Sequence, residues 1–410
     1  MAHFLTLQPV DRILELLGSF APLSLEKLPL ACCAGRVLGA SFAAPEDLPG
    51  FARATMDGYA VRARDVFGAS EGSPALLEYV GECPMGEEPR LAVGPGEAAR
   101  IWTGGMLPQG ADAVVMLEYA RSAGDRQVEL TRPAAPLENV IEADEDAVRG
   151  QELLPEGTLL RPQELGLLAA LGQGTVTVRR RPRVAIISTG DEVVPVDGDP
   201  KPGQVRDINS HTLTALVAAA GGEARALGIV GDDKEELTRL VTDALAFADA
   251  VLVSGGSSAG MRDFTVHAFT AVGAEILAHG VAISPGKPLI MARKGEQSLW
   301  GLPGHAASAL VCAEVFIRPL VRRLLGMTGT DIWRKGLKAT LTRPVPSAQG
   351  RRDYIRVRLV AGPDGSLAAT PVMGKSGLIT TLVEADALVV CPENLEGLDS
   401  GQVVDVHPLL

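Results

Sequence analysis

Residues 183–326 alternate short apolar stretches with helix-forming stretches, and this alternation constrains the fold more than any other feature of the sequence. RVAIIST (183–189) and DAVLVSGG (249–256) have the length of strands, and KEELTRLVTDALAFA, between them, has the apolar spacing of an amphipathic helix. HAASALVCAEVFIRPLVRRLLG (305–326) is expected to close the segment as one long helix bent at Pro319. Such alternation predicts a mostly parallel sheet with helices on both faces and ligands beyond the carboxyl ends of its strands.

A β-rich region lies on each side of this segment. From 45 to 150, short apolar runs alternate with turns of glycine and proline, a pattern that predicts a small β-rich domain. After Gly326, a further series of short strands predicts a barrel or sandwich of about eighty residues. Amphipathic helices predicted over 9–20 and 161–172 are expected to belong together, with the first β-rich domain inserted between them.

Composition limits the cellular compartment and the classes of partner. Lysine and arginine number 38 against 50 for aspartate and glutamate, and the net charge of −12 argues against a general nucleic-acid or anionic-membrane binder. The five cysteines form no CxxC pair, and the first residues lack the features of a signal peptide. No apolar run approaches the ~20 residues of a membrane span. We therefore expect a cytoplasmic protein that binds neither nucleic acid nor membrane.

Four glycine-containing loops are expected at one edge of the predicted sheet. Glycine lets a backbone approach an anion closely, and free amides at a helix N-terminus favour negative charge. Any one loop could be a tight connection, but four at the same edge favour a phosphate-bearing ligand. The loops are STGDEVV (188–194), SGGSSAGMRD (254–263), SPGKP (284–288) and GLPGH (301–305).

Acidic side chains also follow the predicted strands. Glu192, Asp263 and the pair Asp232–Asp233 each come just after a strand. Carboxylates beside a phosphate repel it unless a divalent cation lies between them, and Mg²⁺ takes one or two carboxylates together with phosphate oxygens. The sequence therefore predicts a magnesium site at the loop edge. Helix capping is the alternative for Asp232 or Asp233.

A separate motif, ARATMDGYAVRARD (52–65), places Asp57 in a turn flanked by basic residues. From the residues alone, a surface turn in which Asp57 caps its own backbone is the better interpretation. However, MDGYAV, TGGMLPQGADAVV, STGDE, SGGSSAGMRDFT, PGKP and GLPGH occur in this order along almost the full length of the chain. In order and separation they resemble the motifs of the molybdopterin molybdenumtransferases, the MoeA/gephyrin family of molybdenum-cofactor synthesis.

The resemblance implies a multidomain α/β plus β fold and a homodimer. Each active site would combine the α/β and barrel domains of one chain with the inserted domain of the other. The implied reaction is magnesium-dependent insertion of molybdate into adenylylated molybdopterin with release of AMP, and the protein that adenylylates molybdopterin is a candidate partner. The expected domains are an elongated N-terminal domain (1–45 and 150–178), an inserted β-rich domain (46–149), a central, mostly parallel α/β domain of the molybdopterin-binding type (179–329) and a C-terminal β-barrel (330–410).

The resemblance also assigns site residues, motif by motif. The catalytic set is Asp57, Thr103, Asp146, Glu192, Asp232, Asp263 and Lys287. The magnesium ligands would be Glu192, Asp232 and Asp263. Residues expected to contact the pterin nucleotide or the oxyanion are Thr189, Gly255, Gly256, Ser257, Pro288, Pro303, Gly304, Ser308, Arg351 and Ser376. Arg352 is an alternative to Arg351.

This sequence departs from the family at the expected oxyanion site. Many members carry a lysine directly before PGKP, where this chain has Ser284, and a second lysine four residues earlier, where it has Gly280. The family motif GLPGNP is GLPGHA here, which puts His305 and Ala306 at a helix start. Three alternatives therefore stay open: a molybdate enzyme that relies on its remaining cations, a tungstate-preferring insertase, and a non-catalytic pterin-binding or scaffold paralogue.

Overall fold

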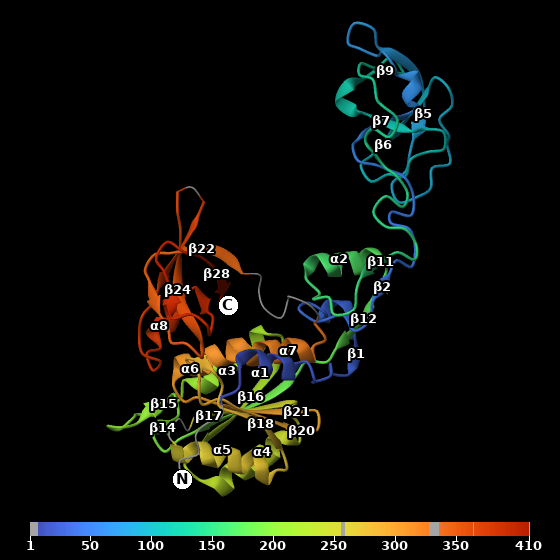
Figure 1. Ribbon diagram of the computed structural model, residues 1–410. Helices are drawn as coiled ribbons and strands as arrows, with labels where there is room; N and C mark the ends of the chain where they lie inside the picture. Colours follow the sequence, from blue (N-terminus) through green and yellow to red (C-terminus); the bar gives the residue numbers. More distant parts are fainter. Residues whose placement is uncertain (1–6, 256–258, 328–335, 364, 410) are drawn as a thin grey trace. The chain divides into compact units, whose positions relative to one another are not determined.

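The computed structural model describes residues 7–255, 259–327, 336–363 and 365–409, and only the backbone of 259–263. The chain forms two compact units (Figure 1). The four domain limits expected from the sequence stay a prediction. The larger unit consists of Met1–Ala40, Glu156–Arg161 and Thr175–Leu410, and the smaller unit consists of Ser41–Pro155 and Pro162–Gly174.

A six-stranded sheet forms the centre of the larger unit. Its first four strands are parallel and the last two are antiparallel to their neighbours, so the predicted mostly parallel sheet is confirmed. β13 is buried over all but its first residue, as expected for a strand covered on both faces. The strand order is β16 (Glu223–Val230), β13 (Arg183–Thr189), β17 (Ala250–Gly255), β21 (Gln297–Leu302), β20 (Ile290–Lys294) and β18 (Glu275–His279).

Helices cover both faces of this sheet (Figure 1). Successive residues of β13 point to opposite faces, so Val184 and Ile186 belong to one hydrophobic core and Ala185 and Ile187 to the other. The first core includes side chains of α1 (Val10–Leu17), α3 (Asn209–Ala219), α6 (Ala306–Cys312) and α7 (Arg318–Leu324). The second includes side chains of α4 (Lys234–Leu245) and α5 (Ala259–Ala271).

The long helix expected over 305–326 contains a π-helical turn. α6 passes into η4 (Ala313–Ile317), and α7 begins directly before Pro319. Proline has no amide hydrogen, and its ring clashes with the carbonyl four residues earlier, here that of Val315. The widened turn lies where this clash falls, as is common for π turns inside helices.

The two helices that were expected to belong together, at 9–20 and 161–172, lie in different compact units. The apolar side of α1 is buried in the core of the larger unit. In contrast, α2 (Pro162–Ala170) belongs to the smaller unit, where Leu167 packs against a cluster that contains Ala44. Helical periodicity indicates that one side of a helix is buried but does not identify the partner that covers it.

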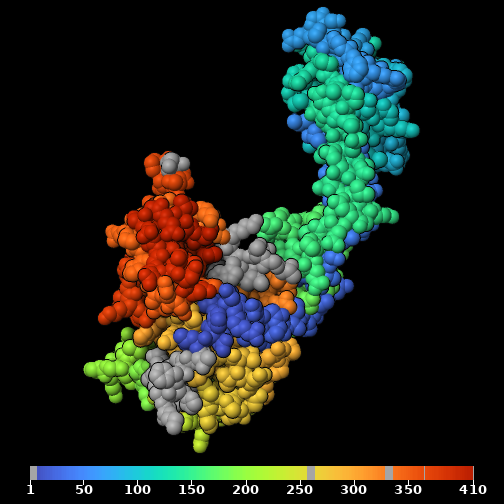
Figure 2. Space-filling view, in the orientation of Figure 1, coloured from blue at the N-terminus to red at the C-terminus, as the bar shows by residue number. Residues whose placement is uncertain are grey.

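The C-terminal part of the larger unit is a closed five-stranded barrel, so the barrel is the correct one of the two predicted alternatives. Its apolar core includes Val357, Val389 and Val406. β19 (Ile283–Ser284), from the α/β part, pairs with the start of β24, and the two parts are in direct contact (Figure 2). The barrel order is β24 (Arg352–Ala361), β25 (Leu367–Pro371), β22 (Leu337–Leu341), β28 (Val403–Pro408) and β26 (Ala387–Cys391), which pairs back to β24.

The smaller unit contains a six-stranded sheet of its own, as the β-rich pattern predicts. Its order is β7 (Ala113–Met116), β4 (Gly58–Val61), β6 (Glu97–Ile101), β5 (Ala75–Glu82), β9 (Gln127–Leu130) and β8 (Ala120–Ser122).

Two-stranded pairs in both units complete the fold. They are β1 (Leu25–Pro29) with β12 (Thr175–Arg179), β2 (Phe42–Ala43) with β11 (Glu152–Leu154), β3 (Arg53–Ala54) with β10 (Val140–Ile141), β14 (Val193–Val194) with β15 (Val205–Arg206), and β23 (Val345–Pro346) with β27 (Gly397–Leu398). None of the helices in the described part of the chain is long and apolar enough to cross a membrane.

Candidate active site

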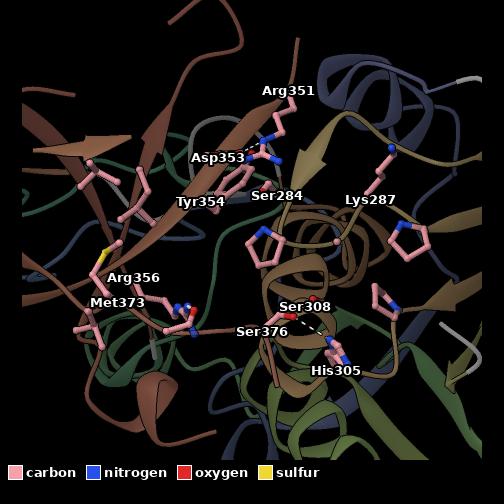
Figure 3. A pocket seen from close by; sticks show the side chains of 18 residues that line it. Ser284, Lys287, His305, Ser308, Arg351, Asp353, Tyr354, Arg356, Met373 and Ser376 are labelled. Atoms are coloured by element: carbon pink, nitrogen blue, oxygen red, sulfur yellow. Dashed lines mark hydrogen bonds and ion pairs between the residues drawn. The ribbon is translucent and has the colours of Figure 1, made fainter. Parts of the chain in front are cut away.

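A cavity of about 600 Å³, here called the larger cavity, lies between the α/β part and the barrel of the larger unit (Figure 3). It is lined by the loop 284–288, the start of α6, the strand β24 and the loop 372–376. The structure thus brings together segments that lie far apart in the sequence. Six of the predicted site residues line this cavity: Lys287, Pro288, Pro303, Ser308, Arg351 and Ser376.

Backbone pairing brings the loop 284–288 against the barrel. β19 pairs in parallel with the start of β24, so Ser284 stands opposite Asp353. Gly286 has a φ of 128°, and a Cβ at this position would lie 2.3 Å from Cys312 Sγ. Only glycine fits this turn. The glycine of the SPGKP motif is therefore explained by packing, and Lys287 is the cationic side chain that this loop contributes to the larger cavity.

Adjacent arginines at the start of β24 have different partners. Arg351 lines the larger cavity and pairs with the buried Asp353, with 2.9 Å between Nε and Oδ1. Arg352 does not line this cavity. It donates to both oxygens of Asp11 at 2.7 and 2.8 Å and to Glu393 at 3.0 Å. These hydrogen bonds lower the pKa of both carboxyls, so Arg352 ties α1 to the barrel.

His305 connects the helix start of α6 to the barrel loop. Its Nδ1 lies 2.8 Å from Ser376 Oγ, and the amide of Ala307 donates to the Ser376 carbonyl at 3.0 Å. His305 lines the larger cavity and also a second cavity of about 310 Å³, here called the smaller cavity. The departure from the family at this position therefore lies at the junction of the two cavities.

The smaller cavity lies beyond the carboxyl ends of β13 and β17, where the sheet topology predicts ligand binding. Gly255 has a φ of 142°, and a Cβ there would lie 2.2 Å from the Thr189 carbonyl oxygen. The two loops can therefore meet only with glycine at this position. Four predicted residues line the cavity: Thr189, Glu192, Gly255 and Gly304. Gly256 and Ser257 lie outside the described residues.

Sequence reasoning missed two buried polar residues of the smaller cavity, Asp207 and Asn209. Asp207 accepts hydrogen bonds from the Ser188 hydroxyl at 2.9 Å and from the Ser210 amide at 3.1 Å. Asn209 donates to Ser254 Oγ and to the Gly304 carbonyl, both at 2.8 Å. The sequence signal was an aspartate three residues before a serine at a helix start, which is typical of a cap.

The predicted carboxylates separate into two roles. The Asp232 amide donates to Asp191 Oδ1 at 2.9 Å. Burial raises the pKa of Asp232, and the nearby charges of Asp191 and Glu192 raise it further. Asp233 instead caps α4 by accepting from two backbone amides of that helix, so capping is the correct alternative for Asp233. The side chain of Asp263 lies outside the described residues.

The donor set near Asp232 fits a magnesium ion bound partly by a ligand. Among the residues whose side chains are described, no three His, Cys, Asp or Glu side chains converge as a complete metal site. Glu192 and Asp232 are two carboxylates close enough to raise a pKa by repulsion. Mg²⁺ takes one or two carboxylates and completes its shell with water and phosphate oxygens, so the pair is a suitable donor set.

In the smaller unit, Asp57 and Thr103 form one exposed cluster. Asp57 Oδ1 accepts from the Thr103 amide at 2.8 Å and from the Thr103 hydroxyl at 2.7 Å. These bonds, with the nearby charge of Arg100, lower the pKa of Asp57. The interpretation that Asp57 caps only its own turn is therefore wrong. Asp146 is exposed, its amide donates to the Leu48 carbonyl at 2.9 Å, and none of the described hydrogen bonds links it to Asp57.

Comparison with known proteins gives the family of this chain. Three family models match it in order: the MoeA N-terminal region (domains I and II) over 8–172, a "Probable molybdopterin binding domain" over 185–323, and the MoeA C-terminal region (domain IV) over 338–409. A Bacillus subtilis molybdopterin molybdenumtransferase is 34% identical over 376 residues, which are 90% of this chain and 86% of that protein. The chain belongs to the MoeA family.

Further relatives agree with this assignment. A Nostoc molybdopterin molybdenumtransferase is 37% identical, over 92% of this chain and 86% of that protein. The crystal structure of the molybdopterin biosynthesis MoeA protein from Pyrococcus horikoshii matches with a TM-score of 0.84 and 31% identity, over 98% of this chain and 100% of that one. The predicted family, the multidomain fold class and the assignment to the transferases are therefore confirmed.

Proposed function

We propose that this MoeA-family transferase inserts molybdate into adenylylated molybdopterin and releases AMP, which forms molybdenum cofactor. Two relatives are named molybdopterin molybdenumtransferase, and one matched domain is described as molybdopterin-binding. The observation that carries the proposal is the larger cavity. Five residues that the resemblance assigns to anion handling line it, namely Lys287, Pro288, Ser308, Arg351 and Ser376, although they come from the α/β part and the barrel.

The two cavities suit two ligands that must meet. Lys287, Arg351 and Ser376 line the larger cavity and supply the cations and the hydroxyl that an oxyanion needs. The glycine loops of the smaller cavity suit the phosphate groups of the pterin nucleotide. His305 lines both cavities, so ligands bound in them would be neighbours. Holding both reactants in this way lowers the entropic cost of their reaction.

A magnesium ion would be held by Glu192, Asp232 and Asp263 beside the smaller cavity. When bound, it would polarise the phosphoanhydride oxygens of the nucleotide. The carboxylates themselves position the cation and accept no proton in this scheme. The raised pKa of Asp232 supports the proposal, because a divalent cation between these groups offsets their mutual repulsion.

We also propose that each active site is completed by the smaller unit of a second chain, in a homodimer. Asp57 and Thr103 form an exposed, hydrogen-bonded pair, and both residues belong to the smaller unit. An ionised carboxylate with a lowered pKa is available there to bind a ligand or a cation.

Molybdate and tungstate have the same charge and nearly the same shape, so both are candidate substrates. Ser284 lines the larger cavity with an uncharged side chain, so this position favours neither anion.

To test the proposed function, the purified chain is incubated with adenylylated molybdopterin, Mg²⁺ and equal concentrations of molybdate and tungstate. We expect AMP release that depends on the oxyanion, with molybdenum on the pterin product. Tungsten on the product supports the tungstate alternative, and AMP release that is absent or independent of oxyanion contradicts the proposed function.

A further inference from the structure

The start of α6 departs from the family motif at His305, where the motif has asparagine. Asparagine is a preferred residue at a helix N-cap, because its side chain can accept a hydrogen bond from a backbone amide of the first turn. In the described start of α6, the His305 side chain makes no capping bond of this kind. It contacts the barrel instead, with 2.8 Å between its Nδ1 and Ser376 Oγ (Figure 3). The His305 side chain is therefore engaged with the barrel loop and not with its own helix.

The direction of this hydrogen bond depends on how many protons the ring carries. The Ser376 backbone is held in place, because its carbonyl accepts from the Ala307 amide at 3.0 Å, whereas its hydroxyl has one proton that can rotate. When the single proton of neutral His305 is on Nε2, Nδ1 accepts and the hydroxyl proton points to the ring. When the ring is protonated, Nδ1 donates to Oγ and the hydroxyl proton is free for another acceptor. The same contact can therefore withhold the Ser376 proton or release it.

A dianion in the larger cavity favours the protonated ring for two reasons. The protonated ring releases the Ser376 hydroxyl as a donor, and it also places a positive charge beside the anion. The neutral tautomer with its proton on Nδ1 releases the hydroxyl too, but it adds no charge. Charge matters at this cavity, because Ser284 stands where many family members have a lysine. Protonated His305 supplies one positive charge to a site from which this departure has removed one.

His305 is the described lining residue whose charge is expected to change near neutral pH. Aspartate, glutamate, lysine and arginine ordinarily keep their charge between about pH 6 and pH 8.5, whereas histidine titrates there. Burial raises the pKa of Tyr354 to about 12, and burial also raises the pKa of the Cys312 thiol of α6. His211, on the neighbouring α3, is not among the described residues that line either cavity. The other charged groups around His305 are Lys287, Arg351, Asp353 and Arg356 in the larger cavity, Glu192, Arg206 and Asp207 in the smaller cavity, and Lys375 in the barrel loop.

We propose that His305 is a positioning residue that couples the binding of molybdate in the larger cavity to the uptake of one proton. The proton comes from solvent and binds to the His305 ring, Nδ1 then donates to Ser376 Oγ, and the Ser376 hydroxyl donates to the anion. The affinity for molybdate should therefore rise as the pH falls through the range in which histidine titrates. This inference rests on the proposed function, because it takes the larger cavity as the oxyanion site.

A purely structural role for His305 makes different predictions. In that role the ring serves only to tie α6 to the barrel loop. Its replacement would then lower the melting temperature and leave the pH dependence of molybdate binding as it is. In the positioning role, the pH dependence itself is lost. His305→Asn separates the two roles, because the asparagine amide is attached to Cγ as Nδ1 is and can donate to Ser376 at every pH.

The experiment uses the full chain as wild type and His305→Asn, with His211→Asn as the matched control because His211 is an exposed histidine on α3. Calorimetry with molybdate alone, at about pH 6 and pH 8.5, gives the affinities across the range of histidine titration. Repeating it at pH 7 in buffers of different ionisation enthalpy gives the number of protons taken up. We expect wild type and His211→Asn to bind molybdate about tenfold more tightly at the lower pH, the effect of one charge-assisted bond, and to take up protons at pH 7. We expect His305→Asn to show equal affinity at both pH values and no proton uptake.

The outcomes separate this inference from the proposed function. An equal pH dependence in wild type and His305→Asn overturns the inference, because protonation of molybdate or of any other group affects both proteins alike. Tighter binding by wild type at the higher pH also overturns it. If His305→Asn does not fold, wild type still decides, since binding without proton uptake at pH 7 overturns the inference. If wild type takes up no proton but releases AMP in response to molybdate, the proposed function stands. If wild type neither binds molybdate nor releases AMP in response to it, both fail.

Discussion

At the residue scale, neighbouring side chains in this protein have different tasks. Arg351 lines the larger cavity, whereas Arg352 ties α1 to the barrel. Asp232 belongs to a group of mutually repelling carboxylates, whereas Asp233 caps α4. Each pair offers its own internal control, since one residue tests function and the residue beside it tests folding.

Arg351→Gln should raise the molybdate concentration needed for half-maximal AMP release by ten- to hundredfold. A charge-assisted hydrogen bond contributes about 1.5–3 kcal/mol, and each 1.4 kcal/mol is a factor of ten. Glutamine keeps a donor for the buried Asp353, so the melting temperature should change little. The rate of AMP release against molybdate, with pterin affinity from calorimetry, measures the effect. Lost pterin affinity with an unchanged molybdate dependence would mean that the two cavities have exchanged roles.

Asp232→Asn should raise the Mg²⁺ concentration needed for turnover at least tenfold, because one of the two described carboxylates that we propose as magnesium ligands loses its charge. Asp233→Ala should leave this requirement unchanged and lower the free energy of unfolding by about 1 kcal/mol, the usual cost of a lost N-cap. Turnover against Mg²⁺ and urea unfolding measure both variants. An equal Mg²⁺ requirement in wild type and Asp232→Asn contradicts the metal assignment.

At the scale of elements, Arg352 connects α1 to the barrel, and an apolar side of α1 packs against the sheet. Arg352 bonds to Asp11 of α1 and to Glu393 of the barrel. The residues Val10, Ile13 and Leu17 are buried in the core of the sheet. The polar connection therefore adds a small contribution to stability that depends on pH.

Asp11→Asn should lower the free energy of unfolding by about 1 kcal/mol at pH 7, the range of a partly exposed ion pair. Arg352 lowers the pKa of Asp11 below its ordinary value of 3.8. A lowered folded pKa gives stability that is present above the ordinary value and is lost as pH falls through the folded value. Urea unfolding of both proteins should therefore show a difference that is constant from pH 7 to 5 and shrinks below pH 4. A difference that grows below pH 4 contradicts this account.

At the scale of the whole molecule, the proposed function places Asp57 of one chain and Asp263 of a second chain in the same active site. An Asp57→Ala chain mixed with an Asp263→Ala chain should recover activity, because one of the two sites in a mixed dimer has both residues intact. At most half of the wild-type activity per mixed dimer is expected. Separately purified variants are the control. No recovery in a verified heterodimer argues against shared sites.

Much of the fold could be predicted because it depends on local patterns. The continuous apolar run of β13 and the glycine turns at Gly255 and Gly286 are properties of short stretches. The partners of distant residues could not be predicted in this way. Thr103 is 46 residues from Asp57, and nothing near Asp57 identifies it as the hydrogen-bond donor.

Part of the candidate site was also hidden from sequence reasoning. Arg356 alternates with apolar residues in DYIRVRLV, so it could lie on the outside of the barrel as Arg358 does. Only the closure of the barrel against the loop 372–376 buries Arg356 and leaves Arg358 exposed. The choice between Arg351 and Arg352 likewise depends on a contact with α1, more than 300 residues away.

The central claim is that the larger cavity binds the oxyanion, and anomalous X-ray diffraction at the molybdenum absorption edge tests it most directly. Crystals of the full chain soaked in molybdate should give a molybdenum peak in the larger cavity, within hydrogen-bonding distance of Ser376 and of at least one of Lys287, Arg351 and Arg356. Crystals of the Arg351→Gln variant at the same concentration should give a weaker peak. A molybdenum peak in the smaller cavity, or none in the larger cavity at saturating molybdate, contradicts the account.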